Sequence, residues 1–160
     1  MERIAIPDAV ELRVDQLEVL KVLYPWYKEE VFRRREQMMR LTAFASAFLV
    51  LLLVTMLAVP SRAHVGFTGE LFAITGVALF SAIFAYLILQ QRNRHRLAKQ
   101  ALIEIERVLG LYEEGFYLQD KPLYPPEWQT SWLRDKSVVV YLAVLTALTA
   151  LVIAAVLVRP

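Results

Sequence analysis

The sequence contains no cysteine and only five glycines. Without cysteine, the chain has no disulfides, no thiolate catalysis, no iron–sulfur cluster and no cysteine-based zinc site. The glycines form no P-loop, no GxGxxG and no GxSxG motif, which removes the phosphate-binding and nucleophilic chemistry of those motifs. A net charge of +2 is too small to indicate nucleic acid as a partner.

Long uncharged runs dominate what is present. Hydrophobic residues make up 58% of the chain, against roughly 45–50% in soluble domains. The excess lies in three runs without a charged residue, at 41–59, 71–89 and 137–158. Each is long enough to cross a hydrocarbon core, which needs about 20 helical residues. If these runs were buried helices of a soluble protein, 160 residues would not supply the shell to cover them. We therefore predict an all-α integral membrane protein with three transmembrane helices.

Basic residues near the ends of these runs predict the orientation. Residues 1–40 are hydrophilic, which is the wrong order for a cleavable signal peptide. One side of the membrane receives the basic residues Arg33, Arg34, Arg35, Arg40, Arg92, Arg94, Arg96, Lys99, Arg134 and Lys136, and the other only Arg62 and Arg159. We expect cytoplasmic N-terminal helices at 1–40, an outer loop at 60–70, a cytoplasmic segment at 90–136 and the C-terminus outside.

Both cytoplasmic segments have helical spacing of apolar residues. Pro7 and Asp8 predict a helix start, and Pro25 predicts that this first helix ends or kinks, with a second helix running from Trp26 into the first span. The second span is expected to continue as a helix to Gly110 or Gly115. Its apolar stripe consists of Leu97, Ala101, Leu102, Ile105, Val108, Leu109 and Tyr112. Helices 1 and 2 should thus extend into a small cytoplasmic helical bundle.

Two similar aromatic strings flank this bundle, LYPWY at 23–27 and LYPPEW at 123–128. We expect the prolines to hold the second string extended. Tyr124 and Trp128 are then candidates to cap the bundle near Pro25, where the two strings could meet. The alternative is a docking surface for a protein partner on the cytoplasmic side, with the prolines displaying the aromatic rings.

Two further sets of residues are candidate sites. The first is a basic collar at the lipid headgroups, which would orient the chain and attract anionic membrane lipid, or would ring the mouth of a pore. It consists of Arg33, Arg34, Arg35, Arg92, Arg94 and Arg96. The second is a stripe of small residues in the third span, Ala143, Ala147, Ala150 and Ala154. Such stripes let helices approach closely, although alanine is common in all membrane helices. They favour a homo-oligomer.

Catalytic chemistry is not indicated by any set of polar residues. The spans contain no ionisable residue, which disfavours carrier-type transport. His64 and His95 fall in different segments and offer no clustered metal ligands. His95, Glu104 and Glu106 are expected to be solvated. We predict no cofactor and no enzymatic activity, and rank an enzyme acting on lipid last.

The arrangement from about Trp26 to Tyr112 resembles the SLATT-type effectors of bacteria. The resemblance rests on a helical arm with the basic run YKEEVFRRREQMMR, a tight two-span hairpin and the returning helix RNRHRLAKQALIEIERVLGLY. It implies membrane disruption or pore formation in the bacterial inner membrane, triggered by a partner. The third span departs from the two-span pattern of that family. The leading hypothesis is a self-assembling membrane effector, and the alternative is a scaffold or accessory subunit of a larger membrane complex.

Overall fold

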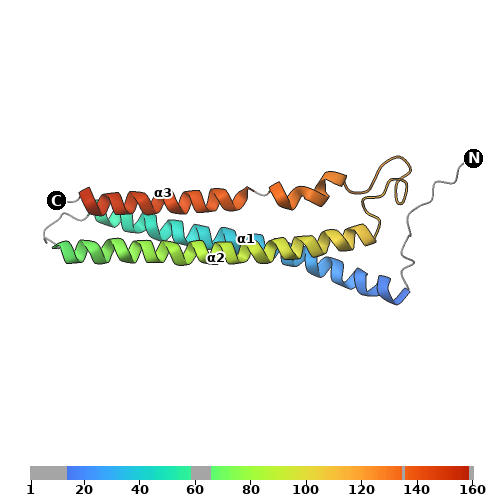
Figure 1. The fold of residues 1–160 in the computed structure, drawn as a ribbon, viewed down its shortest axis with the longest axis horizontal. Helices are drawn as coiled ribbons and strands as arrows, with labels where there is room; N and C mark the ends of the chain where they lie inside the picture. Colours follow the sequence, from blue (N-terminus) through green and yellow to red (C-terminus); the bar gives the residue numbers. More distant parts are fainter. Residues whose placement is uncertain (1–13, 59–65, 135, 159–160) are drawn as a thin grey trace, which may run out of the picture.

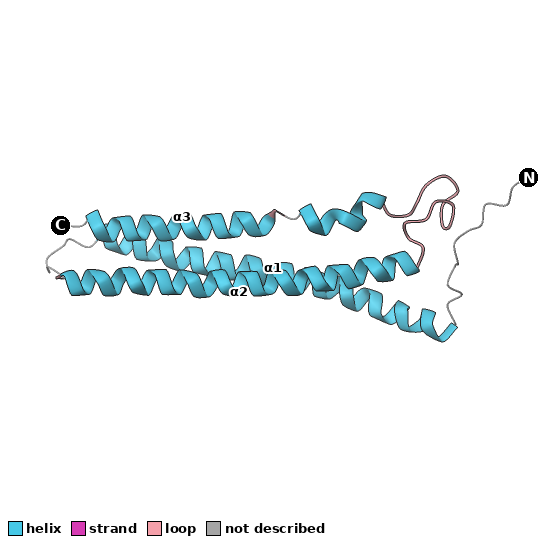
Figure 2. Ribbon diagram, viewed as in Figure 1, coloured by secondary structure: helices cyan, strands magenta, loops and turns pink. Residues whose placement is uncertain are grey.

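The computed structural model describes residues 14–58, 66–134 and 136–158, and this part of the chain contains helices and no strand. The elements are α1 (Val14–Ala58), α2 (Phe67–Val108), the 3-10 helix η1 (Pro126–Arg134) and α3 (Ser137–Val158). The long helices lie side by side in an elongated bundle, with α3 alongside one half of the α1–α2 pair (Figure 1, Figure 2). The predicted helix start at Pro7 and Asp8, and residues 60–65 of the predicted outer loop, lie outside the described residues.

All three long helices are long and apolar enough to cross a membrane, in agreement with the three predicted runs. One boundary differs. The helix α2 begins at Phe67, so residues 67–70, which were predicted as loop, are helical. Its first turn closes where the Gly69 amide donates to the Gly66 carbonyl at 2.7 Å. Glu70 lies in that first turn, where a carboxylate is stabilised by the helix dipole.

The core is a single apolar seam shared by the three helices. It contains Met38, Ala45 and Leu49 from α1, Val77 and Ile88 from α2, and Val138, Leu145 and Val152 from α3. Within each helix these residues recur at spacings of four, seven or eleven, so they form one narrow stripe, as in coiled coils and helical bundles. The rings of Phe48 and Phe80 meet across the α1–α2 interface at 4.6 Å.

The helix α1 continues through Pro25 as one helix of 45 residues. Of the two predicted alternatives at Pro25, an end or a kink of the helix, the end is therefore wrong. Proline lacks an N–H, so the Lys21 carbonyl has no helical donor, at a cost of about 3 kcal/mol. Pro25 and Lys21 are both exposed, which leaves that carbonyl open to water. The many hydrogen bonds of a helix this long outweigh the single lost one.

The helix α2 ends in a Schellman motif at Gly110, one of the two predicted end points. Gly110 has φ +69, its amide donates to Arg107, and the Leu111 amide donates back to Glu106. The segment that follows is not extended throughout, contrary to the sequence prediction. It makes tight turns and then enters η1 at Pro126. Proline is well suited to the first turn of a helix, because its missing N–H would have no helical partner there.

Candidate functional site

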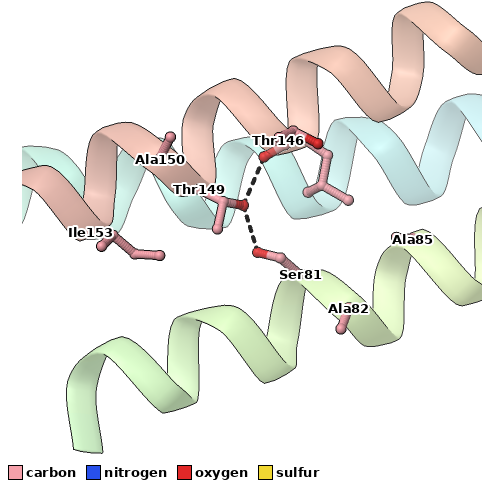
Figure 3. A pocket seen from close by; sticks show the side chains of 8 residues that line it. Ser81, Ala82, Ala85, Thr146, Thr149, Ala150 and Ile153 are labelled. Carbon is pink, nitrogen blue, oxygen red and sulfur yellow. Dashed lines mark hydrogen bonds between the residues drawn. The ribbon is translucent and has the colours of Figure 1, made fainter. Parts of the chain in front are cut away.

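A groove of about 390 Å³ lies between α2 and α3, within the predicted second and third spans (Figure 3). Its lining comes from both helices: Ser81, Ala82, Ala85, Leu145, Thr146, Thr149, Ala150 and Ile153. Small side chains make up most of this set, so the two helix backbones are thinly covered here. Such a surface favours close approach by another helix.

Two of the three hydroxyl groups in this groove, those of Ser81 and Thr149, bind each other. The Thr149 hydroxyl donates to the Leu145 carbonyl at 2.7 Å. Because that uses its one proton, the Ser81 hydroxyl is the donor in the 2.7 Å bond between Ser81 Oγ and Thr149 Oγ1 (Figure 3). This pair ties α2 to α3 and satisfies polar groups that would be costly to leave unpaired in hydrocarbon. A carrier site would need an ionisable side chain at this depth, and the groove has none.

The predicted small-residue stripe of α3 faces away from the core. All four of its members, Ala143, Ala147, Ala150 and Ala154, are exposed. The packed side of the helix is formed instead by Val138, Leu145 and Val152. The stripe is therefore not used within the chain, and Ala150 lines the groove. Sequence reasoning did not identify Ser81. Hydroxyl side chains in both the second and the third predicted span could have suggested a hydrogen bond between the two helices.

The basic collar is brought together from α1 and α2. Arg34 donates to Glu30 at 2.7 Å on its own helix and to Gln91 of α2 at 3.1 Å. Arg33 pairs with Glu29 at 2.7 Å. Arg35 and Arg94 are exposed, whereas Arg92 and Arg96 are half-buried. The collar residues thus lie at one level of the bundle, directly beyond the predicted spans.

Two polar residues on α2 are buried, contrary to the sequence prediction. His95 faces α1, and its Nδ1 lies 3.2 Å from the carbonyl oxygen of Val31. Glu106 is buried against Tyr112. By contrast, Leu97 and Val108 of the predicted apolar stripe are exposed. The buried side of α2 continues from Ile88 through positions 95, 102 and 105, because packing against α1 selects the face regardless of single-residue polarity.

Glu104 is solvent-exposed as predicted, and it pairs with Arg107 at 2.8 Å. In the part of the chain that the structure describes, no group of three or more histidine, aspartate or glutamate residues could hold a metal ion.

A tyrosine cluster lies at the end of α2 and joins the two aromatic strings. The hydroxyls of Tyr24 and Tyr124 are 2.8 Å apart, so LYPWY and LYPPEW meet in space. Tyr112 donates to the buried carboxylate of Glu106, and its ring lies 6.1 Å from that of Tyr124. Desolvation and the hydrogen bond to Tyr124 raise the pKa of Tyr24 above its usual value. Desolvation and the Glu106 carboxylate likewise raise the pKa of Tyr112.

Tyr124 and Trp128 occupy different places in this cluster. The backbone amide of Tyr124 donates to the Leu111 carbonyl at 2.8 Å, which fastens the return segment to the end of α2. Trp128 lies against Tyr124 with ring centroids 5.3 Å apart, and it is 52% exposed. Tyr124 thus connects the return segment to both helices, while Trp128 covers it from outside.

Comparisons of the chain with protein-family models, with curated proteins and with solved structures find no match.

Proposed function

We propose that this chain is a multi-pass membrane protein that self-assembles in the bilayer and acts through that assembly rather than by catalysis. The three long apolar helices and the segregation of basic residues support insertion with the N-terminus in the cytoplasm. In this orientation the collar lies at the inner headgroups. The C-terminus and the connection between α1 and α2 lie outside.

The observation that carries the proposal is the α2–α3 groove. In the most apolar 18-residue stretch of each long helix, only 17% is buried within the chain. The three helices therefore leave most of their surface facing outward. Lipid covers leucine and phenylalanine as well as protein does, but it packs less closely over small residues. The groove offers such a surface in Ala82, Ala85 and Ala150. A helix of a second copy would gain van der Waals contact there.

A head-to-tail contact of this kind closes into a ring when the rotation from one copy to the next divides a full turn evenly. A ring of copies would also gather the arginine collars at one level, where they would line the mouth of a pore and attract anions. We therefore propose a membrane-perturbing or pore-forming effector, in line with the resemblance to SLATT-type proteins, and place it in the bacterial inner membrane.

Cysteine cross-linking tests the assembly directly, because the native chain has no cysteine to interfere. Ala150→Cys should form disulfide-linked dimers in membranes under mild oxidation. Leu151→Cys is the matched control, since Leu151 is exposed at the same depth but points about 100° away around the helix. Equal cross-linking of the two variants, or none with Ala150→Cys while the chain remains monomeric in mild detergent, would refute assembly through the groove.

The membrane activity needs a separate test. Purified protein reconstituted into vesicles should release an entrapped anionic dye, and Ala150→Leu should reduce release together with the oligomer. Reporter fusions at positions 65, 115 and 160 check the orientation, and position 115 should report a cytoplasmic location. If the vesicles stay sealed at every protein density, the proposed pore is refuted, whereas the proposed oligomer is not.

A second function is favoured by the exposed aromatic residues of the return segment. Phe116, Tyr117 and Trp128 are each more than half exposed, on a segment anchored by Tyr124. Such a surface is typical of docking sites. It supports a role as a scaffold or accessory subunit that holds a cytoplasmic protein at the membrane. Stoichiometric co-purification of an unlike chain that is lost with Trp128→Ala, without loss of folding, would favour this function over the effector.

A further inference from the structure

A second groove lies between α1 and α2 where the predicted spans meet the collar. It measures about 510 Å³ and is lined by Gln37, Arg40, Leu41, Phe44, Phe84 and Gln91. The antiparallel helices place a polar end formed by residues 37, 40 and 91 beside an apolar floor formed by residues 41, 44 and 84. The groove therefore changes from polar to apolar along its length. This change lies at the level where a membrane would pass from polar headgroups to hydrocarbon.

The polar end consists of hydrogen-bond donors. Arg34 donates to the side-chain oxygens of Gln91 at 3.1 Å and Gln37 at 3.5 Å. Because arginine only donates, both amides must present their oxygens to it and direct their NH2 groups elsewhere. The guanidinium of Arg40 adds further donors. It pairs with Glu36 in an exposed contact, with 78% and 60% of the two side chains accessible, which is readily exchanged for a stronger partner.

The apolar floor suits a hydrocarbon chain. The rings of Phe44 and Phe84 are stacked at 5.8 Å, with Leu41 beside them toward the collar. The neighbourhood is also strongly basic: residues 33–40 and 91–96 contain seven arginines and one glutamate. A ligand for this groove should thus combine an anionic headgroup that accepts hydrogen bonds with an acyl chain.

We infer that this groove is a binding site for one anionic phospholipid of the inner leaflet. Arg40, Gln37 and Gln91 bind the phosphate, and Phe44 and Phe84 hold the first part of an acyl chain. Basic pockets between membrane helices bind anionic headgroups in this way. Zwitterionic lipid fits less well, because its quaternary amine would meet the arginine collar. The inference rests on the membrane insertion in the proposed function, and it adds a specific lipid to the general attraction of the collar.

Native mass spectrometry of the delipidated protein in mild detergent tests this site. Titration with dioleoyl-phosphatidylglycerol should give one saturable lipid per chain, and dioleoyl-phosphatidylcholine should bind more weakly. Arg40→Gln should lower the phosphatidylglycerol affinity by about tenfold, since a charge-assisted bond to phosphate is lost. Inorganic phosphate at millimolar concentration should not displace the lipid, because it lacks the acyl chain.

The control is Arg107→Gln. Arg107 is likewise an exposed arginine paired with a glutamate on its own helix, but it lies 16 residues from Gln91, roughly 24 Å along α2. At physiological salt that distance exceeds the screening length of about 8 Å, so affinity should stay within about twofold. Gln37→Glu is a second, nearly isosteric variant. It keeps the acceptor for Arg34 but places a negative charge at the phosphate, and it should also weaken binding about tenfold.

Equal affinity of Arg40→Gln and Arg107→Gln, or displacement of the lipid by inorganic phosphate, would overturn the inference. The same spectra report the oligomer. Bound lipid that falls as the oligomer rises would assign the groove to a second copy of the chain and overturn the lipid site. A monomer that still binds phosphatidylglycerol would keep the lipid site and refute self-assembly.

Discussion

The two halves of the bundle are held together in different ways. In the apolar half (residues 41–58, 67–89 and 137–158) three helices share every buried side chain of the seam except Met38. In the polar half (residues 18–40 and 90–134) specific bonds cross between elements, such as Arg34 to Gln91 and Tyr24 to Tyr124. The apolar half is held together by close packing of complementary side chains, whereas the polar half is held together by specific hydrogen bonds. Apolar packing supplies cohesion that tolerates small shifts, and the polar bonds fix the register of α1 against α2.

The proposed membrane insertion explains this division. Lipid solvates apolar side chains well, so helices in a bilayer gain mainly from close packing. In water an exposed ion pair gains little, and polar bonds contribute more where side chains are partly buried. The bonds between elements in the polar half fit this rule. Arg34 and Gln91 are half-buried, and Glu106 and Tyr112 are buried.

The largest expected effect is the loss of a buried side chain from the seam. Leu49 is fully buried, whereas Leu51 on the same helix is 65% exposed. Leu49→Ala should lower the free energy of unfolding in detergent by about 2–5 kcal/mol, because it removes contacts and leaves a cavity. Leu51→Ala should change it by less than about 0.5 kcal/mol. Similar losses for both variants would mean that the seam is not the packed core.

High pH should act on the polar half alone. The folded-state pKa of both Tyr24 and Tyr112 is raised above the ordinary 10.0. Their contribution to stability is therefore complete below pH 10 and is lost as pH rises from there toward the folded-state values. Amide hydrogen exchange, corrected for its intrinsic pH dependence, should show residues 105–128 opening while α3 stays protected. The double variant Tyr24→Phe and Tyr112→Phe should lack this step, and its persistence would assign the opening to other groups.

Removal of one hydroxyl should weaken the polar half at lower pH as well. Tyr112→Phe leaves the buried carboxylate of Glu106 without its tyrosine donor, at a cost of about 1–3 kcal/mol. Tyr117→Phe is the matched control. Tyr117 is half exposed and donates to the Leu109 carbonyl, which water can replace. Thermal unfolding in detergent distinguishes them. A control that is as destabilised as Tyr112→Phe would show that the Glu106 pair has no special weight.

Much of this comparison was predictable from sequence. The three runs, the antiparallel helical arms and the helix end at Gly110 follow from length, periodicity and the φ > 0 that glycine tolerates. The meeting of the two aromatic strings was also anticipated, since LYPWY lies at Pro25 on one helical arm and LYPPEW follows the end of the other. These features are local, or follow from a short connection between two long helices.

What the sequence did not predict depends on the rotation of the helices about their axes. His95 and Glu106 read as solvated because of their charge and basic neighbours, yet the seam turns both inward. Pro25 predicts an end or a kink, yet α1 continues through it, because its exposed position leaves the freed carbonyl to water. The groove between α2 and α3 requires Ser81 and Thr149 to face each other across 68 residues. No spacing within one helix specifies that pairing.

Removal of the Trp128 ring, which covers Tyr124, should have a smaller effect on stability. Trp128→Ala removes a ring that lies 5.3 Å from Tyr124, and we expect a loss of about 0.5–1.5 kcal/mol in thermal stability. Trp26→Ala is the control, because Trp26 has similar exposure but contacts its own neighbour Tyr27 at 4.9 Å. Its removal should cost less, since that contact does not join separate elements. If Trp128→Ala retains full stability but abolishes binding of a partner protein, Trp128 belongs to a docking surface.

The smallest expected effect lies inside the apolar half, where a polar bond crosses the seam. Ser81 and Thr149 join α2 to α3, and hydrogen bonds between membrane helices contribute only about 0.6 kcal/mol on average. A double-mutant cycle with Ser81→Ala and Thr149→Val isolates that coupling from the bond that Thr149 also makes to Leu145. The matched cycle in the polar half uses Tyr24→Phe and Tyr124→Phe. We expect the tyrosine pair to show the larger coupling, because a typical hydrogen bond that is partly buried contributes about 0.5–1.5 kcal/mol. A larger coupling for Ser81 and Thr149 would reverse the comparison. The register of the helices would then be fixed within the apolar half, and the tyrosine cluster would be available to bind a partner protein.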